Sequence, residues 1–79
     1  MPLPSLPERD ENGNRPAAAT AQVVLARRII RAREAQGLSR RELAERSGLA
    51  VETLARLESG RQMPRPATIE KLMRVLGEF

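Results

Sequence analysis

Arginine side chains surround two short apolar runs in the stretch LSRRELAERSGLAVETLARLESG, residues 38–60. The guanidinium group is a planar cation that can form paired hydrogen bonds with phosphate oxygens and with the O6 and N7 atoms of guanine. With two that follow in the next loop, the arginines that carry the argument are Arg40, Arg56, Arg61 and Arg65. The chemistry open to them is the binding of a polyanion, and the elements between them must hold them in position.

Most catalytic and metal chemistry lacks its residue types in this sequence. There is no cysteine and no histidine, which removes thiolate chemistry, the usual zinc ligands and a histidine-based triad. No nucleophile–base pair, metal-ligand cluster or phosphate-cradling loop is visible. We therefore expect a protein that is not an enzyme and that needs neither cofactor nor metal. The single aromatic residue, Phe79, also excludes a stacking platform for single strands.

The charge of the chain is uneven. The net charge is +4, but Arg9 and Arg15 are outnumbered by Glu8, Asp10 and Glu11, so residues 1–19 sum to −1 and the remainder to +5. A basic domain attracts polyanions, of which nucleic acid is the common one. No apolar run approaches the roughly 18 residues of a membrane span, and the first residues do not resemble a signal peptide. We expect a cytoplasmic protein, associated with the nucleoid and not with a membrane.

The sequence divides into a tail and one folded domain. Residues 1–19 hold four of the six prolines and have almost nothing to bury, so we expect them to be disordered. The domain, residues 20–79, should be all-α, with helices at about 20–36, 40–47, 50–58 and 66–76. Thr20 is the expected N-cap of the first helix, and Ser39 with Glu42 forms a capping box for the second. Period-two alternation that would indicate a strand is missing.

The second and third helices are predicted to form a helix-turn-helix. Ala44 is small enough to let the helices cross closely, and Gly48 permits the positive φ of a tight turn. Leu43, Leu54 and Leu57 would fill the wedge between them. This arrangement leaves the N-terminal half of the third helix exposed at the width of a DNA major groove.

The segments RAREAQGLSRRELAERSGL, TLARLESGRQMPRP and TIEKLMRVL resemble the lambda-repressor-like family of helix-turn-helix proteins, of the Cro/cI or XRE type. The resemblance runs over about residues 24–76. It implies a compact bundle of four, or at most five, helices that binds double-stranded DNA. Family members usually bind a palindromic operator as homodimers and regulate transcription, most often by repression.

The resemblance also assigns roles to single residues. Arg33 and Glu58 match a structural ion pair between the first helix and the end of the third. Arg40 matches a position that contacts phosphate, at the positive end of its helix dipole, and Ser39 beside it is also expected to contact phosphate. Arg61, Gln62 and Arg65 match a loop that tracks the DNA backbone. Such contacts position the protein and carry no sequence information.

Val51, Glu52, Thr53 and Arg56 occupy the positions that should read bases. Val51 can pack on a thymine methyl group, Glu52 can accept from a cytosine amine, and Arg56 can pair with guanine. Two features depart from the commonest family pattern. Ala50 stands where a capping Ser or Thr is usual, and Val51 and Glu52 stand where the family often has Gln, Arg or Ser. Alternatively, Glu52 only stabilises its helix N-terminus, and Arg56 contacts phosphate or pairs with Glu52.

Three functions stay open at this point. The first is a dimeric repressor of its own or a neighbouring promoter. The second is the antitoxin of a toxin–antitoxin pair, in which the proline-rich tail would wrap a toxin protein and fold on binding. The third is a protein-interaction module that has lost DNA binding. For dimerisation, the expected surface is the end of the last helix, with Met73, Leu76 and Phe79; Leu76 is also a core candidate.

Overall fold

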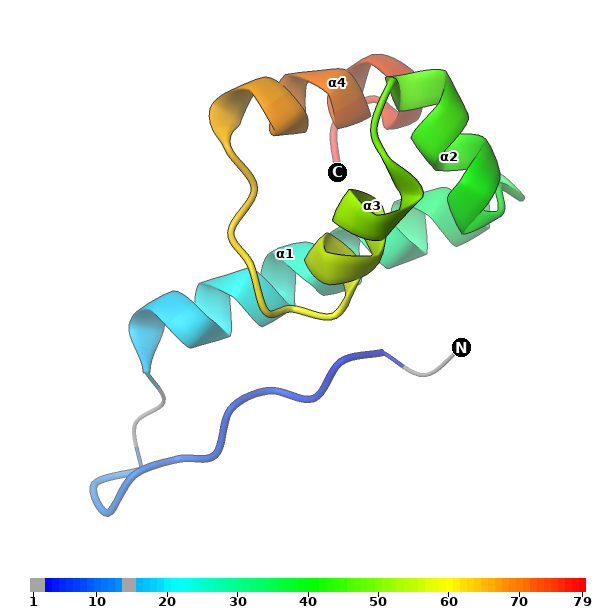
Figure 1. Ribbon diagram of the computed structural model, residues 1–79. Coiled ribbons are helices and arrows are strands. Elements are labelled where there is room, and N and C mark those ends of the chain that lie inside the picture. Colours follow the sequence, from blue (N-terminus) through cyan, green and yellow to red (C-terminus); the bar gives the residue numbers. More distant parts are fainter. Residues whose placement is uncertain (1–2, 14–15) are drawn as a thin grey trace.

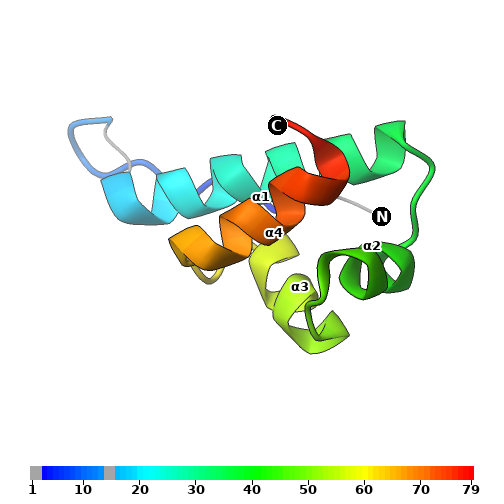
Figure 2. The same cartoon turned by 90° about the horizontal axis from the view of Figure 1, so that it is seen from above.

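The computed structural model describes residues 3–13 and 16–79, which form four helices and no strand. The helices are α1 (Ala17–Ala35), α2 (Arg40–Ser47), α3 (Val51–Glu58) and α4 (Pro66–Leu76). In Figure 1, α2, α3 and α4 lie on one side of α1, and residues 3–13 run along its other side. Seen from above, α4 crosses over α1 (Figure 2). The predicted all-α class with four helices is confirmed.

Helix α1 is longer at its start than the sequence predicts. It begins at Ala17, and its N-cap is Pro16, which provides no side-chain hydrogen bond. Thr20 is not the cap: its backbone N–H donates to the Pro16 carbonyl oxygen at 2.9 Å, inside the first turn. The physical reason is the alanine run before Thr20, because alanine has the highest helix propensity. Residues 17–19 therefore belong to α1 and not to the tail; residues 1–2 and 14–15 of that predicted tail lie outside the described residues.

The described part of the tail buries more than its composition suggests. Leu3, Pro4, Leu6 and Pro7 are half-buried. The Arg27 Nε–H on α1 donates to the carbonyl oxygen of Pro4 at 3.0 Å. Gly60 lies beside Pro4, since a Cβ atom built on it would be in van der Waals contact with Pro4 Cβ at 3.6 Å. The expectation that these residues have almost nothing to bury is wrong for this segment.

The core lies between the helices and is aliphatic. Its largest fully buried side chains come from all four helices. They are Ile29, Ile30, Leu43, Leu54, Leu57 and Leu72, and the small Ala44 and the helix-end Leu76 are also buried. Burial of one such side chain contributes roughly 1.5–3 kcal/mol. Because α3 packs against both α1 and α2, this core fixes the direction of α3, the helix that carries the candidate base-reading residues.

The turn between α2 and α3 depends on Gly48. This residue has φ 73° and ψ 26°, the left-handed conformation that glycine adopts without a Cβ clash. The Leu49 N–H then donates to the Ala44 carbonyl oxygen at 2.9 Å, which closes α2. Helix α3 begins at Val51, one residue later than predicted, because Ala50 takes the extended N-cap conformation. Ala50 supplies no capping hydrogen bond.

Candidate nucleic-acid interface

Helix α3 presents a polar face outward and a buried stripe inward. Leu54, Leu57 and Glu58 form the buried stripe. Glu52 and Arg56 are exposed, and Val51 is 38% exposed although it is aliphatic. Thr53 is half-buried. The four predicted base-reading residues thus all keep some accessible surface on one short helix, and the helix is held from behind by its leucines.

The start of α2 is fixed by a reciprocal cap. The Ser39 hydroxyl accepts from the Glu42 N–H at 3.0 Å, and a Glu42 carboxylate oxygen accepts from the Ser39 N–H at 3.0 Å. These hydrogen bonds lower the pKa of Glu42 below its ordinary value of 4.5. The bond from the Ser39 backbone N–H has the larger effect and the bond with the Ser39 side chain the smaller, and the charge of Arg46 adds to both. Since its hydroxyl is engaged in the cap, Ser39 would meet a phosphate mainly through its place at the positive end of the helix.

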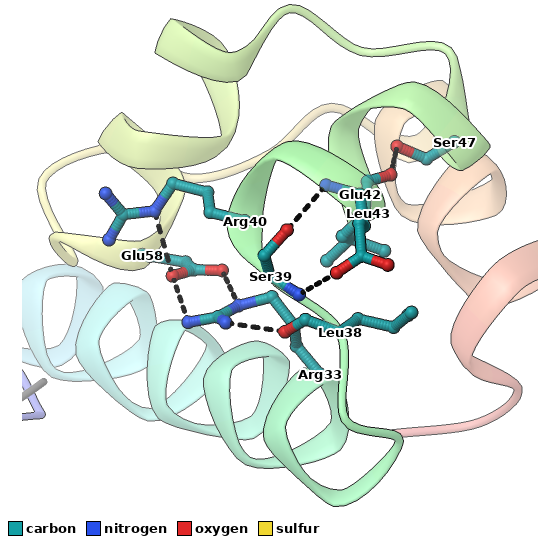
Figure 3. A network of polar contacts seen from close by, with 8 residues as sticks. All are labelled: Arg33, Leu38, Ser39, Arg40, Glu42, Leu43, Ser47 and Glu58. Atoms are coloured by element: carbon teal, nitrogen blue, oxygen red, sulfur yellow. Dashed lines mark hydrogen bonds and ion pairs between the residues drawn. The ribbon is translucent and has the colours of Figure 1, made fainter.

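A buried carboxylate joins α1, α2 and α3. Glu58 accepts two hydrogen bonds from Arg33, from Nε at 2.9 Å and from Nη2 at 3.1 Å. Arg40 Nε donates to the same carboxylate at 3.2 Å. Figure 3 shows the two guanidinium groups meeting at Glu58 from different elements. The side chain of Glu58 is fully buried and that of Arg33 nearly so, whereas the Arg40 side chain is 34% exposed.

Arg33 has a further partner that orders the chain before α2. Its Nη1 donates to the carbonyl oxygen of Leu38 at 2.9 Å (Figure 3). Leu38 is itself buried and directly precedes the Ser39 cap. Arg33 therefore connects the end of α1, the entry to α2 and the end of α3. Forked charge-assisted bonds of this kind are the stronger class of hydrogen bond and fix geometry as well as energy.

The loop from α3 to α4 carries the remaining predicted phosphate contacts. Arg61, Gln62 and Arg65 are all exposed. Between them, Pro64 is buried and anchors the loop to the domain. Arg65 is the N-cap residue of α4, with Pro66 in the first turn. The loop thus displays its polar residues while its middle is fixed.

The structure separates the predicted site residues into groups. It brings Arg33, Arg40 and Glu58 together. Val51, Glu52 and Arg56 stand on the exposed face of α3, and their side chains have no hydrogen bond or ion pair to another described residue. The contact between Arg40 and Glu58 was not predicted. The two residues are 18 positions apart, and the family motif accounts for Glu58 through Arg33 alone, so the sequence holds no separate signal for it.

One of the three residues expected at the dimer surface, Leu76, is buried in the core of the chain. Leu76 is only 7% exposed and packs with Leu72 in the interior, as the i, i+4 spacing of the two requires. It does not form part of an accessible surface in this chain. Met73 is 39% exposed, and Phe79 is half-buried against the core. Met73, Glu70 and Arg74 line a shallow hollow of about 380 Å³ on α4.

Four helices, a glycine turn between the second and third, and an exposed third helix define a helix-turn-helix domain. The family model for helix-turn-helix proteins matches residues 29–78, well over half of the chain. The chain belongs to this family, of the Cro/cI and XRE type. It is a family of DNA-binding transcription regulators and not of enzymes. No curated protein matches the chain.

Two further observations concern other kinds of site. In the described ranges, 3–13 and 16–79, acidic side chains do not gather into a group that could hold a metal ion. Across the same residues, the helices are too short or too polar to cross a membrane.

Proposed function

We propose that this regulator is a sequence-specific, dimeric repressor that acts on its own or a neighbouring promoter. The observation that carries the proposal is the exposed face of α3, where Val51, Glu52 and Arg56 are accessible on a helix fixed by buried leucines. A rigid helix of this width suits the major groove, where each good base contact gives ~1–3 kcal/mol of discrimination. Phosphate contacts from Arg40 and from the loop residues Arg61, Gln62 and Arg65 would set the register on the duplex.

Dimerisation belongs to this proposal because one helix in one groove makes too few contacts for a tight site. Met73 on α4 and Phe79, three residues beyond the end of α4, are the side chains that we assign to the interface. A symmetric dimer would place its two α3 helices about 34 Å apart, on successive turns of a palindromic site. Sedimentation of the chain and of Met73→Asp, alone and on DNA, tests this. A wild-type protein that stays monomeric in both conditions excludes the dimer.

The central experiment is fluorescence anisotropy against two duplexes at several salt concentrations. One duplex is the DNA directly upstream of the gene for this protein, and the other is its scrambled sequence. We expect salt-sensitive binding to the first that is at least ~10³-fold tighter than to the second. Equal binding to both would contradict autoregulation, and no binding to either at low salt would contradict DNA binding by this chain.

The second candidate is an antitoxin, and the observation that favours it is the described tail. Leu3, Pro4, Leu6 and Pro7 are only half-buried, so the segment could leave α1 and order on a partner protein. Co-expression with the product of the adjacent gene distinguishes the two functions. Relief of growth inhibition by the full chain, and its loss without residues 1–13, would support the antitoxin. On either view the protein acts in the cytoplasm, on the DNA.

A further inference from the structure

A hollow of about 580 Å³ lies between the tail and the N-terminal half of α1. Its lining includes Arg9 from the tail and, from α1, Thr20, Ala21, Val24, Leu25 and Arg28. In Figure 1 this half of α1 lies at the end of the domain away from α2. The hollow is therefore a surface separate from the predicted DNA contacts of Arg40 and Ser39.

The floor of the hollow is apolar. Ala21, Val24 and Arg28 follow one another at i, i+3 and i+7, which places them on one stripe of the helix. Val24 is 37% exposed and is one of the few large apolar side chains that the described chain leaves accessible. Leu25, beside it, is partly buried against the core. An aliphatic side chain of a partner would remove this surface from water.

The polar groups around that floor favour a negative ligand. The guanidinium groups of Arg9 and Arg28 form no hydrogen bond or ion pair with another described residue. The first turn of α1, the positive end of its dipole, contains no acidic residue. Glu8, Asp10 and Glu11 of the tail do not line the hollow.

We propose that this hollow binds an acidic, aliphatic peptide segment of a partner protein. Carboxylates of the segment pair with Arg28 and Arg9, and an aliphatic side chain covers Val24 and Ala21. Charge complementarity carries the choice of partner, since two guanidinium groups that pair with no described residue flank an exposed apolar strip. Such a partner would add protein control to a regulator whose described residues fold as one small domain.

The test uses the full chain and acetylated, amidated pentapeptides in a titration followed by NMR. The acidic probe is Glu-Leu-Ala-Leu-Glu, and the matched control, Gln-Leu-Ala-Leu-Gln, has the same apolar side chains without charge. We expect the acidic probe to shift the amide signals of Thr20, Val24 and Arg28 and to bind roughly tenfold more tightly than the control, as one or two charge-assisted bonds allow.

Substitutions then test whether Arg28 is the cation that pairs with the carboxylates of the peptide. Arg28→Glu should weaken the acidic probe by roughly tenfold or more and create binding of Lys-Leu-Ala-Leu-Lys. The matched control is Arg41→Glu, since Arg41 is an exposed arginine on α2. This substitution should change neither the affinity for the acidic peptide nor that for the lysine peptide. Affinity of Arg28→Glu for duplex DNA should stay at the wild-type value, so a failure of the proposed DNA binding would be seen separately.

Four results would overturn the proposal. The first is equal binding of the acidic and neutral peptides, and the second is a set of shifts spread over all basic surfaces. The third is a shift of the Thr20, Val24 and Arg28 amide signals when the protein concentration is raised without peptide. That result would mean that a second copy of the chain occupies the hollow. Loss of duplex affinity in Arg28→Glu would equally assign the hollow to the DNA surface and refute a peptide site.

Discussion

Arg40 Nε lies 3.2 Å from Oε1 of Glu58, the oxygen that also accepts from Arg33 Nη2. The arginine expected to contact phosphate is therefore oriented by a buried carboxylate at the end of α3. This contact couples the start of α2 to the end of the helix that is expected to read bases. The side chain would reach a phosphate already ordered, which lowers the entropy lost on binding.

The two arginines at Glu58 should differ in their effect on stability. Arg33→Ala should lower the free energy of unfolding by ~3–5 kcal/mol, because it removes a forked, buried partner of a buried charge. Arg40→Ala should cost less than ~1 kcal/mol, since a third of its side chain is exposed and water screens the pair. Urea denaturation measures both. Arg33→Lys keeps the charge but loses the paired hydrogen bonds of the guanidinium group, so its loss of stability should lie between those of the two alanine variants. Equal losses for Arg33→Ala and Arg40→Ala would contradict the different roles given to the two arginines.

Gly60 should tolerate a side chain less well than Gly48. Both have positive φ, 74° and 73°, so alanine at either position costs about 1–2 kcal/mol from the backbone alone. At Gly60 a Cβ atom would also lie 3.0 Å from Val23 Cγ2 and 3.3 Å from Val23 Cα, whereas at Gly48 nothing lies within 4 Å. Thermal denaturation of Gly60→Ala and Gly48→Ala compares them. Val23→Ala should partly relieve the Gly60→Ala defect, and identical losses at both glycines would refute the steric account.

The capping box should contribute stability that depends on pH. The pKa of Glu42 is lowered in the folded chain by the N–H and the hydroxyl of Ser39. A lowered folded pKa means that the contribution is present above the unfolded pKa and is lost as the pH falls through the folded one. The stability difference between wild type and Glu42→Gln should therefore shrink as the pH falls below about 4.5. Urea denaturation at a series of pH values measures this difference, and NMR titration of the Glu42 carboxylate measures its pKa. A difference independent of pH would argue against the cap.

Local signals in the sequence were sufficient for the positions of the helices after residue 36. Ser39 and Glu42 predict the start of α2, Gly48 its end, and Pro66 the first turn of α4, because each acts through hydrogen bonds or φ angles within a few residues. The start of α1 was missed because propensity in the alanine run outweighs the capping preference of Thr20. Here two local signals compete, and only their relative strength decides between them.

Contacts between distant segments could not be predicted in the same way. Pro4 reaches Arg27 and Gly60, and Arg40 reaches Glu58, only after the helices have packed. No periodicity or spacing encodes such pairs. The hollow at Arg9 and Arg28 is of this type as well, since its two arginines come from segments that the sequence assigns to a tail and to a domain. The family resemblance supplied the pair of Arg33 and Glu58 but none of these.

Arg56 and Arg40 should separate sequence preference from general affinity for DNA. Arg56 is exposed on α3, so Arg56→Ala should lose ~1–3 kcal/mol on the preferred duplex and little on a duplex changed at the base it contacts. Arg40→Ala should weaken both duplexes alike and reduce the salt slope by about 1. Anisotropy with the upstream duplex and its single-base variants measures both effects. Arg31→Ala, exposed on α1, is the control and should leave both unchanged. If Arg56→Ala weakened every duplex to the same extent, Arg56 would be a phosphate contact, and Val51 and Glu52 would have to supply the sequence preference.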